Sequence, residues 1–220
     1  MNISDIIGPI MIGPSSSHTA GAARLGNLAR NVFGNPIKSA QIYLHGSFAE
    51  TYKGHGTDLA LVAGLLGYAP SDERIPQAFE YAKEKNLDFQ FHTIDLGKHT
   101  HPNTVKFILE GVENQTSEII GSSLGGGMVT ISSIDGFTVN FTGQYPVLIV
   151  KHEDRPGVIS KVTSILAEQE INIAQMRVFR QNKGGEALMV LEIDYPVNQA
   201  TMSLIEKVLY VQEIRSIKNT

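Results

Sequence analysis

The stretch VLIVKHEDRPGVISKVTSILAEQEINIAQMRVF, residues 147–179, decides the fold of the second half of the chain. Residues 147–150 form an apolar run of strand length, and residues 157–170 repeat apolar side chains at helical spacing. Asp154 stands where the cap of this helix is expected. Residues 171–179 then have the length and composition of a second strand.

The residues that follow complete a pattern of six elements. A turn at 182–185 leads into a strand at 187–195, a helix at 200–209 and a last strand at 211–217. The order strand, helix, strand, strand, helix, strand predicts a ferredoxin-like βαββαβ domain. Such a domain is an antiparallel sheet with two helices on one face.

The first half is less regular, and its helices precede most of its strands. A helix at 18–33 is expected to end at Gly34, and Ser17 is a candidate cap for its start. The pattern also predicts a strand at 37–45, helices at 57–66 and 76–85, and strands at 89–94, 105–109, 119–124, 128–134 and 137–141. Helices followed by strands predict an α+β domain.

A break in the pattern at residues 142–146 separates the two halves. We therefore expect one domain at residues 1–143 and a second at residues 146–220, so that the fold class of the whole chain is α+β. A chain of 220 residues is long enough for two small domains.

The composition limits the classes of function. The net charge of −4 gives no basic footprint for nucleic acid, and no apolar run reaches the roughly 18 residues of a membrane helix. The first residues lack the pattern of a signal peptide, so a cytoplasmic location is expected. There are no cysteines, which excludes disulfides, thiol nucleophiles and thiolate-held metal clusters on this chain.

A polar turn, GPSSSHT at residues 13–19, stands directly before the first predicted helix. Amide groups at a helix start carry partial positive charge and bind anions such as carboxylates, and hydroxyls add short hydrogen-bond donors. Ser15, Ser16 and Thr19 are therefore candidate ligand contacts. The alternative is that this turn only caps the helix.

A second polar segment, HGSFAETYKGHGTD, covers residues 45–58 and leads into another helix, for which Thr57 is a candidate cap. His55 lies between two glycines, which let the backbone bend and let a ligand approach. Because an imidazole titrates near neutral pH, His55 is a candidate proton shuttle, with Asp58 close to it in sequence.

Two further motifs remain. In KHTHPN, residues 98–103, the alternating His99 and His101 are open to a zinc interpretation or to a solvated loop. In SSLGGGMV, residues 122–129, the glycines do not match the dinucleotide-binding fingerprint. They are interpreted as a hairpin turn or a point of close packing.

Taken together, the segments GPSSSHT, GSFAETYKGHGTD, HPN and SLGGG resemble the β-chain of the iron–sulfur-dependent bacterial L-serine dehydratases. The stretch HEDRPGVISKVTSILAEQEINIAQMRVFR resembles an ACT domain. The resemblance covers nearly the whole chain. It implies an N-terminal α+β domain of substrate-binding type followed by a ferredoxin-like ACT domain.

The resemblance also implies a reaction, the conversion of L-serine to pyruvate and ammonia by a lyase of amino-acid degradation and gluconeogenesis. In this family a [4Fe–4S] cluster acts as the Lewis acid that takes the hydroxide. Iron–sulfur clusters are held by cysteine thiolates, and this chain has none. The cluster is therefore expected on a partner α chain, with no metal on this chain, which would be inactive alone.

Roles for individual residues follow from the same resemblance. His55 is the first candidate for a catalytic histidine, and His18 is the second. Which of the two takes the proton stays open. Substrate-side roles fall on seven residues, namely Ser15, Ser16, Ser17, Thr19, Asp58, His101 and Asn103.

ACT domains typically pair side by side and bind amino acids at the shared boundary, which implies a homodimer through residues 146–220. Asp154, Gly157 and Asn172 match the ligand side of such a domain. The first half also resembles a substrate-sensing domain of some phosphoglycerate dehydrogenases. The alternative function is therefore a non-catalytic sensor or regulatory subunit that binds amino acids or anions.

Overall fold

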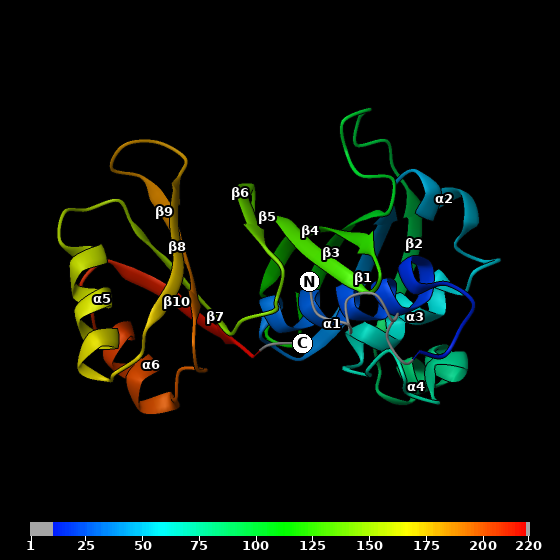
Figure 1. Ribbon diagram of the computed structural model, residues 1–220, viewed down its shortest axis with the longest axis horizontal. Helices are drawn as coiled ribbons and strands as arrows, with labels where there is room; N and C mark the ends of the chain where they lie inside the picture. Colours follow the sequence, from blue (N-terminus) through cyan, green and yellow to red (C-terminus); the bar gives the residue numbers. More distant parts are fainter. Residues whose placement is uncertain (1–10, 219–220) are drawn as a thin grey trace. The chain divides into compact units, whose positions relative to one another are not determined.

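The computed structural model describes residues 11–218, and Figure 1 shows its elements in chain order. The chain divides into two compact units between Gly136 and Phe137. The domain boundary predicted at residues 143–146 stays a prediction. Within residues 11–218, no helix is long and apolar enough to cross a membrane.

The first unit begins with a π-helical turn, Ser16–Ala20, that continues directly into α1, Gly21–Phe33. The elements that follow are β1 (Ile37–Leu44), α2 (Ser47–Thr51), α3 (Thr57–Leu65), a 3₁₀ turn (Ile75–Gln77), α4 (Ala78–Glu84), β2 (Asp88–Thr93), β3 (Thr104–Gly111), β4 (Thr116–Gly125) and β5 (Met128–Ile134). The predicted C-terminal glycine of the first helix is confirmed, since Gly34 is left-handed with φ 75° and its N–H bonds the carbonyl of Arg30.

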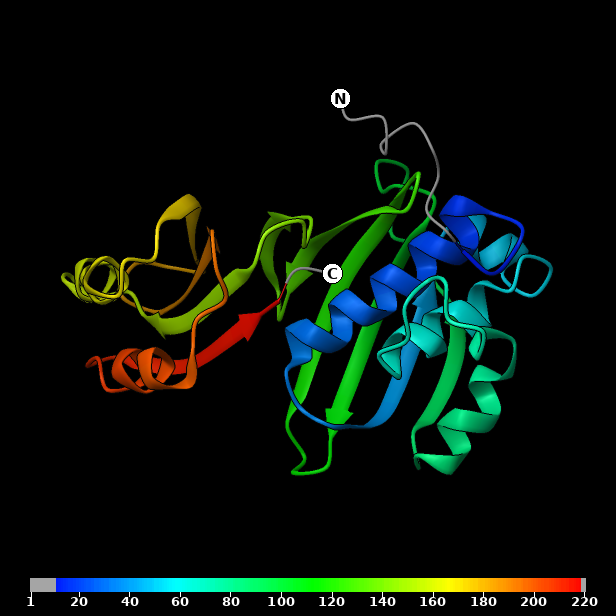
Figure 2. The ribbon, with the colours of Figure 1, turned by 60° about the horizontal axis from the view of Figure 1, so that its bottom comes forward.

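Six strands form the first sheet in the order β2-β1-β3-β4-β5-β6, where β6 is Phe137–Phe141. β1 pairs in parallel with β2 and antiparallel with β3, and β4 is antiparallel to both β3 and β5. Figure 2 shows α1 lying across these strands with α3 beside it. The polar motifs lie at the C-terminal ends of β1 and β4 and at the N-terminal end of β3. These three strand ends are neighbours, so the motifs meet at one end of the sheet.

α1 and α3 pack closely because small residues face each other where they meet. A Cβ on Gly26 would collide with the carbonyl oxygen of Leu61, and one on Gly64 would collide with that of Ala23. On the sheet side of α1, Leu25 lies against Gly121 of β4 and is fully buried. The packing holds the start of α1, and with it the polar turn, in a fixed place on the sheet.

Within the second unit, residues 147–217 form the six elements that their sequence predicts, so the ferredoxin-like fold is confirmed. They are β7 (Val147–Glu153), α5 (Val158–Glu168), β8 (Ile173–Arg180), β9 (Glu186–Ile193), α6 (Gln199–Glu206) and β10 (Val211–Ile217). The antiparallel sheet has the order β10-β7-β9-β8. Its core gathers Leu148 and Val150 from β7 with Val162 and Leu166 from α5.

Three helix caps differ from the sequence prediction. Ser15, not Ser17, caps the first turn, because its hydroxyl accepts the N–H of His18. α3 begins after Gly56 in the left-handed conformation, and Thr57 makes no capping bond. α5 begins after Gly157, which is also left-handed. Glycine replaces the predicted side-chain caps at the last two starts because the chain enters the helix with positive φ.

Candidate active site

The polar turn is built from a single π-helical turn. Ser15 organises it, since its carbonyl accepts the N–H groups of Thr19 and Ala20. The carbonyl of Ser16 accepts the N–H of Gly21, which continues into α1. Short π-helical turns of this kind are rare and are frequently found at functional sites.

β4 packs against this turn through Ser123. The Ser123 hydroxyl donates to the carbonyl of Ser17 at 2.9 Å. A Cβ on Gly21 would collide with the same hydroxyl, so only glycine lets the two segments come this close. Ser123 is fully buried, and it therefore fixes the turn relative to the sheet.

Hydroxyl groups surround the imidazole of His18. Its Nδ1 lies 3.0 Å from Oγ of Ser17 and 3.5 Å from Oγ of Ser15, and these two hydroxyls are 3.3 Å apart. Its Nε2 lies 3.1 Å from Oγ of Ser47, the first residue of α2. The buried ring of Phe48 meets the imidazole edge-on with the ring centroids 5.2 Å apart.

The two candidate histidines lie against each other. The rings of His18 and His55 meet edge-on with centroids 4.9 Å apart. Thr19 ties the two segments together, because its hydroxyl donates to the carbonyl of His55 at 3.2 Å. Burial, and after it the nearby His55, lower the pKa of His18 below its ordinary value. The ring of His55 is exposed and makes no hydrogen bond with any residue in the range 11–218.

Asp58 lies three residues beyond His55 but does not hydrogen-bond to it within the described chain. Its Oδ1 accepts the N–H of Leu59 at 2.9 Å. Burial raises the pKa of Asp58, while backbone hydrogen bonds and the charge of Lys53 act in the opposite direction. A carboxylate destabilised by burial favours a cationic ligand beside it.

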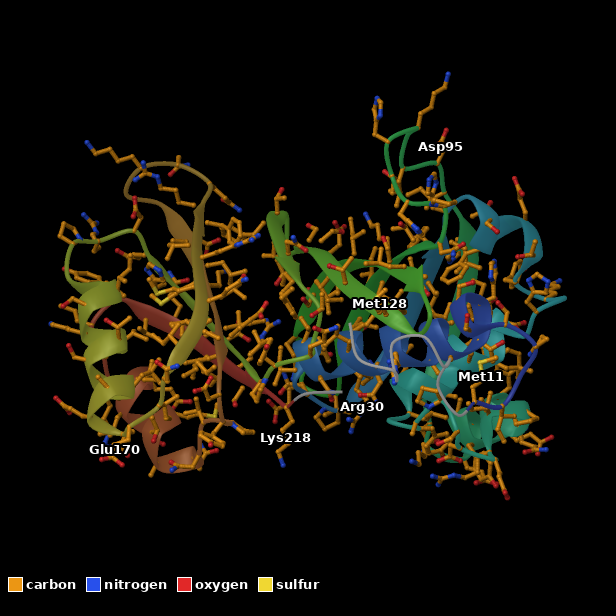
Figure 3. All side chains as sticks on the ribbon, in the orientation of Figure 1. Met11, Arg30, Asp95, Met128, Glu170 and Lys218 are labelled. Atoms are coloured by element: carbon orange, nitrogen blue, oxygen red, sulfur yellow. The ribbon has the colours of Figure 1, made fainter. Side chains whose placement is uncertain are left out.

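The HPN segment, residues 101–103, makes a tight turn at this end of the sheet, directly before β3. The Asn103 N–H donates to Nδ1 of His101 at 3.1 Å, and the Asn103 carbonyl accepts the N–H of Ser123 at 3.0 Å. Oδ1 of Asn103 is buried and has no hydrogen-bond partner among residues 11–218. Figure 3 labels Asp95 in the loop that leads to this segment and Met128 at the start of β5.

A close approach joins HPN to the start of α2. Gly46 has φ +56°, and a Cβ there would come within 2.8 Å of the Cα of Pro102. The Phe48 N–H donates to the carbonyl of Pro102 at 3.3 Å. All four polar motifs therefore meet: the serine turn touches α2 through His18, α2 touches HPN, and HPN touches β4, which returns to the turn.

The zinc interpretation finds no cluster of ligands. His99 is exposed, and the ring of His101 is engaged by the N–H of Asn103. Among residues 11–218, no three side chains of histidine, cysteine, aspartate or glutamate gather closely enough to hold a metal ion. The chain has no cysteine, so its residues do not fit an iron–sulfur cluster.

The candidate ligand residues of the second unit are only partly together. Asp154 and Gly157 line a hollow of about 450 Å³ whose other lining residues include Arg180 and Lys183. Asp154 accepts from Arg180 at 3.0 Å and from the Gly184 N–H, and these bonds lower its pKa. Asn172 is not among the lining residues.

Asn172 instead donates to Oδ2 of Asp194 at 3.2 Å, outside the hollow. In the first unit, the sequence analysis missed Ser47, Phe48 and Ser123. Ser47 and Phe48 stand inside the segment 45–58, directly after Gly46, and Ser123 is the first residue of SLGGG. For Ser47, the available signal was a polar residue next to a glycine.

Comparison with known proteins agrees with both units. Residues 3–133 match the family described as "Serine dehydratase beta chain", and residues 146–210 match "ACT domain". An L-serine dehydratase β-chain from Peptoniphilus asaccharolyticus is 41% identical over 91% of this chain and 90% of its own. A probable L-serine dehydratase β-chain from Bacillus subtilis is 41% identical over 98% of this chain and 97% of its own.

A D-3-phosphoglycerate dehydrogenase from Synechocystis is more distant. It is 29% identical over 90% of this chain, which corresponds to only 35% of that enzyme. The same two-unit segment thus also occurs as part of a longer protein.

Proposed function

Since the chain belongs to the serine dehydratase β-chain family, we propose that it works with a cluster-bearing α chain to convert L-serine to pyruvate and ammonia. The enzyme would act in the cytoplasm, in amino-acid degradation and gluconeogenesis. The observation that carries the proposal is the meeting of His18 and His55 beside the serine turn. Two imidazoles and several hydroxyls in one place suit proton transfer to and from a small polar substrate.

The reaction begins with removal of the proton from Cα of L-serine. In our proposal His55 takes this proton, because its exposed ring is available while both ring nitrogens of His18 are engaged. Loss of the β-hydroxyl then gives aminoacrylate, which tautomerises and reacts with water to release ammonia and pyruvate. His55 returns its proton to solvent or to a product.

The substrate-side residues have complementary chemistry. The turn that holds Ser15, Ser16, Ser17 and Thr19 offers hydroxyls and a helix start to the carboxylate of serine. The partnerless Oδ1 of Asn103 is an acceptor that suits an ammonium N–H. Asp58, whose charge burial disfavours, would gain from the same cation. His101 contributes by holding the backbone of Asn103.

Hydroxide is a poor leaving group, so this dehydration needs a Lewis acid. We place it in a [4Fe–4S] cluster on the partner α chain, because the present chain has no thiolate to bind one. The β chain alone would then be inactive. We also propose that two copies pair through their ACT domains, where an amino acid binds near Asp154 and Gly157.

Anaerobic reconstitution tests the proposal. We expect pyruvate to form from L-serine only when the α and β chains are combined. His18→Ala and His55→Ala should abolish most of this turnover without preventing association, whereas His99→Ala, on an exposed loop, should not. Turnover by the β chain alone, or full turnover with both histidines removed, would refute it.

A second candidate function is a non-catalytic sensor, and the similarity to D-3-phosphoglycerate dehydrogenases favours it. There the matching segment accompanies a different catalytic region. Calorimetry separates the two functions. A sensor should bind L-serine or a related acid tightly without the α chain, and the histidine variants should leave turnover of the complex unchanged.

A further inference from the structure

Ser47 contributes a hydroxyl to His18 for which the roles above give no use. Its Oγ lies 3.1 Å from Nε2, while Oγ of Ser17 lies 3.0 Å from Nδ1 on the other side of the ring. Ser47 is 29 residues away from His18 in sequence. The imidazole is therefore held between two hydroxyls that come from separate segments of the chain.

The backbone around Ser47 is fixed on both sides. Gly46 has φ +56° and ψ −129°, a conformation that side chains rarely adopt, and it lies against Pro102. On the other side, Phe48 is fully buried and its N–H donates to the carbonyl of Pro102. The hydroxyl of Ser47 is thus aimed at His18 by packing and not by a free rotation of the loop.

A neutral imidazole donates from one ring nitrogen and accepts at the other. Hydroxyls can serve in either role, so Ser17 and Ser47 together fix the plane of the His18 ring whichever nitrogen carries the hydrogen. Burial and His55 lower the pKa of His18, which keeps this ring neutral near neutral pH. The ring of His55, by contrast, makes an edge-on contact with His18 and no hydrogen bond within residues 11–218.

We propose that Ser47 is a positioning residue, whose hydroxyl fixes the orientation of the His18 ring so that His18 in turn fixes the ring of His55 toward the substrate. This inference rests on the proposed dehydratase function, which requires an aligned base. It also gives the HPN segment a second task, because Pro102 holds Gly46 and Phe48, the two neighbours of Ser47.

Kinetics of the reconstituted complex test the catalytic part. Ser47→Ala should lower kcat about tenfold, the scale of one lost hydrogen bond, and change KM less than about twofold. Ser47→Thr keeps the hydroxyl and should recover most of kcat. Ser39→Ala is the matched control: it removes a serine hydroxyl that bonds Glu110 at the other end of β1, and kcat should not change.

Nitrogen-15 NMR of the histidine rings tests the structural part in the β chain alone. Ser47→Ala should shift the Nδ1 and Nε2 resonances of His18, and that of Nε2 more strongly, because this nitrogen loses the hydroxyl that lies 3.1 Å away. Ser39→Ala should leave them unchanged. The amide spectrum of each sample reports folding, and Ser47→Cys, of similar size, replaces Ser47→Ala if the alanine variant unfolds.

Ser47→Ala with wild-type His18 shifts would overturn the proposal, and so would shifted resonances with an unchanged kcat. Failure of the dehydratase function looks different. In that case the wild-type complex forms no pyruvate, while the ring shifts of the β chain still show whether Ser47 fixes His18.

Discussion

In the first unit, burial disfavours the charged forms of two candidate residues, whereas in the second unit the charge of the candidate carboxylate is already paired. Burial lowers the pKa of His18 and raises that of Asp58, so both groups resist ionisation, and Oδ1 of Asn103 has no hydrogen-bond partner among residues 11–218. Near β7, Asp154 is paired with Arg180, and its pKa is lowered. A ligand can stabilise a group whose charged form is disfavoured, and it can supply a hydrogen bond to an atom that has none.

One buried atom of the second unit, Nε2 of His152, also lacks a hydrogen-bond partner among residues 11–218. This atom does not contradict the difference between the units. Nε2 of His152 makes no hydrogen bond, but its ring is 1% exposed and its Nδ1 bonds the carbonyl of Glu153. It lies on the helix-covered side of the sheet, between Ala187 and Val211 on the neighbouring strands. A ligand from solvent does not reach it, so a partnerless atom indicates a site only where access exists.

The largest effect is expected from the two histidines. His55→Ala should lower kcat of the reconstituted complex by about 10²–10⁴, the range for loss of a general base. Because the two rings touch, the double variant with His18→Ala should add little to the larger single effect. Steady-state assays of the two single variants and the double variant measure this coupling. Strictly additive losses would mean that the two rings act independently.

Gly21→Ala should come next, with an effect on both structure and activity. The new Cβ collides with Oγ of Ser123, and if Ser123 rotates away it loses its bond to the carbonyl of Ser17. We expect a loss of about 2 kcal/mol in the free energy of unfolding and a loss of kcat of about tenfold or more.

Urea unfolding and the pyruvate assay measure these two effects. Gly54→Ala is the control, because a Cβ there meets only the carbonyl of Thr51 at an ordinary 3.7 Å. If Gly21→Ala changed the free energy of unfolding and kcat no more than Gly54→Ala does, the π-helical turn would tolerate movement.

The pH response should separate the two units. His18 has a folded pKa below its ordinary 6.5, so the folded chain binds fewer protons than the unfolded chain, and stability falls as the pH drops from 6.5 toward that pKa. Asp154 has a folded pKa below 3.8, so its contribution is present above 3.8 and is lost only in stronger acid.

NMR titration of the His18 ring checks the first half of this response. His55→Ala removes the coulombic effect of His55 and should raise the pKa of His18, although burial remains the larger cause. A His18 pKa that stays in place or falls in this variant would contradict the assigned coupling between the rings.

The same two regions show what the sequence can predict. The second unit has regular periodicity, and residues 211–217 were predicted as the strand that the structure assigns to β10. In the first unit, the sequence pattern predicted the helix that ends at Gly34. It did not predict the π-helical turn before this helix, nor α2, which has only five residues. Periodicity is informative over several turns, and neither of these elements is long enough.

The site shows a related limit. His18, His55 and the serine turn were found from local composition, because polar residues between glycines stand out in a sequence. Ser47 was not found, because its contact with His18 depends on how α2 packs against Pro102. Asn172 was assigned from a resemblance to other ACT domains, and here it pairs with Asp194.

Asp154→Ala should have the smallest effect. It tests whether a carboxylate that is already paired, in the second unit, contributes to turnover. The substitution removes an acceptor for Arg180 and for the N–H of Gly184, both of which then meet water at the surface. Such exposed pairs contribute little, so the melting temperature should shift by less than about 2 °C, and kcat should stay within about twofold.

Arg155→Ala is the matched control for this variant, because Arg155 lines the same hollow and its pair with Glu153 is similarly exposed. Calorimetric melting and the pyruvate assay measure both variants. If Asp154→Ala lowered kcat as strongly as the histidine variants do while Arg155→Ala did not, a saturated surface pair in the second unit would be part of the catalytic machinery. Disfavoured charges and missing hydrogen-bond partners would then no longer distinguish the catalytic region of the first unit from the second unit.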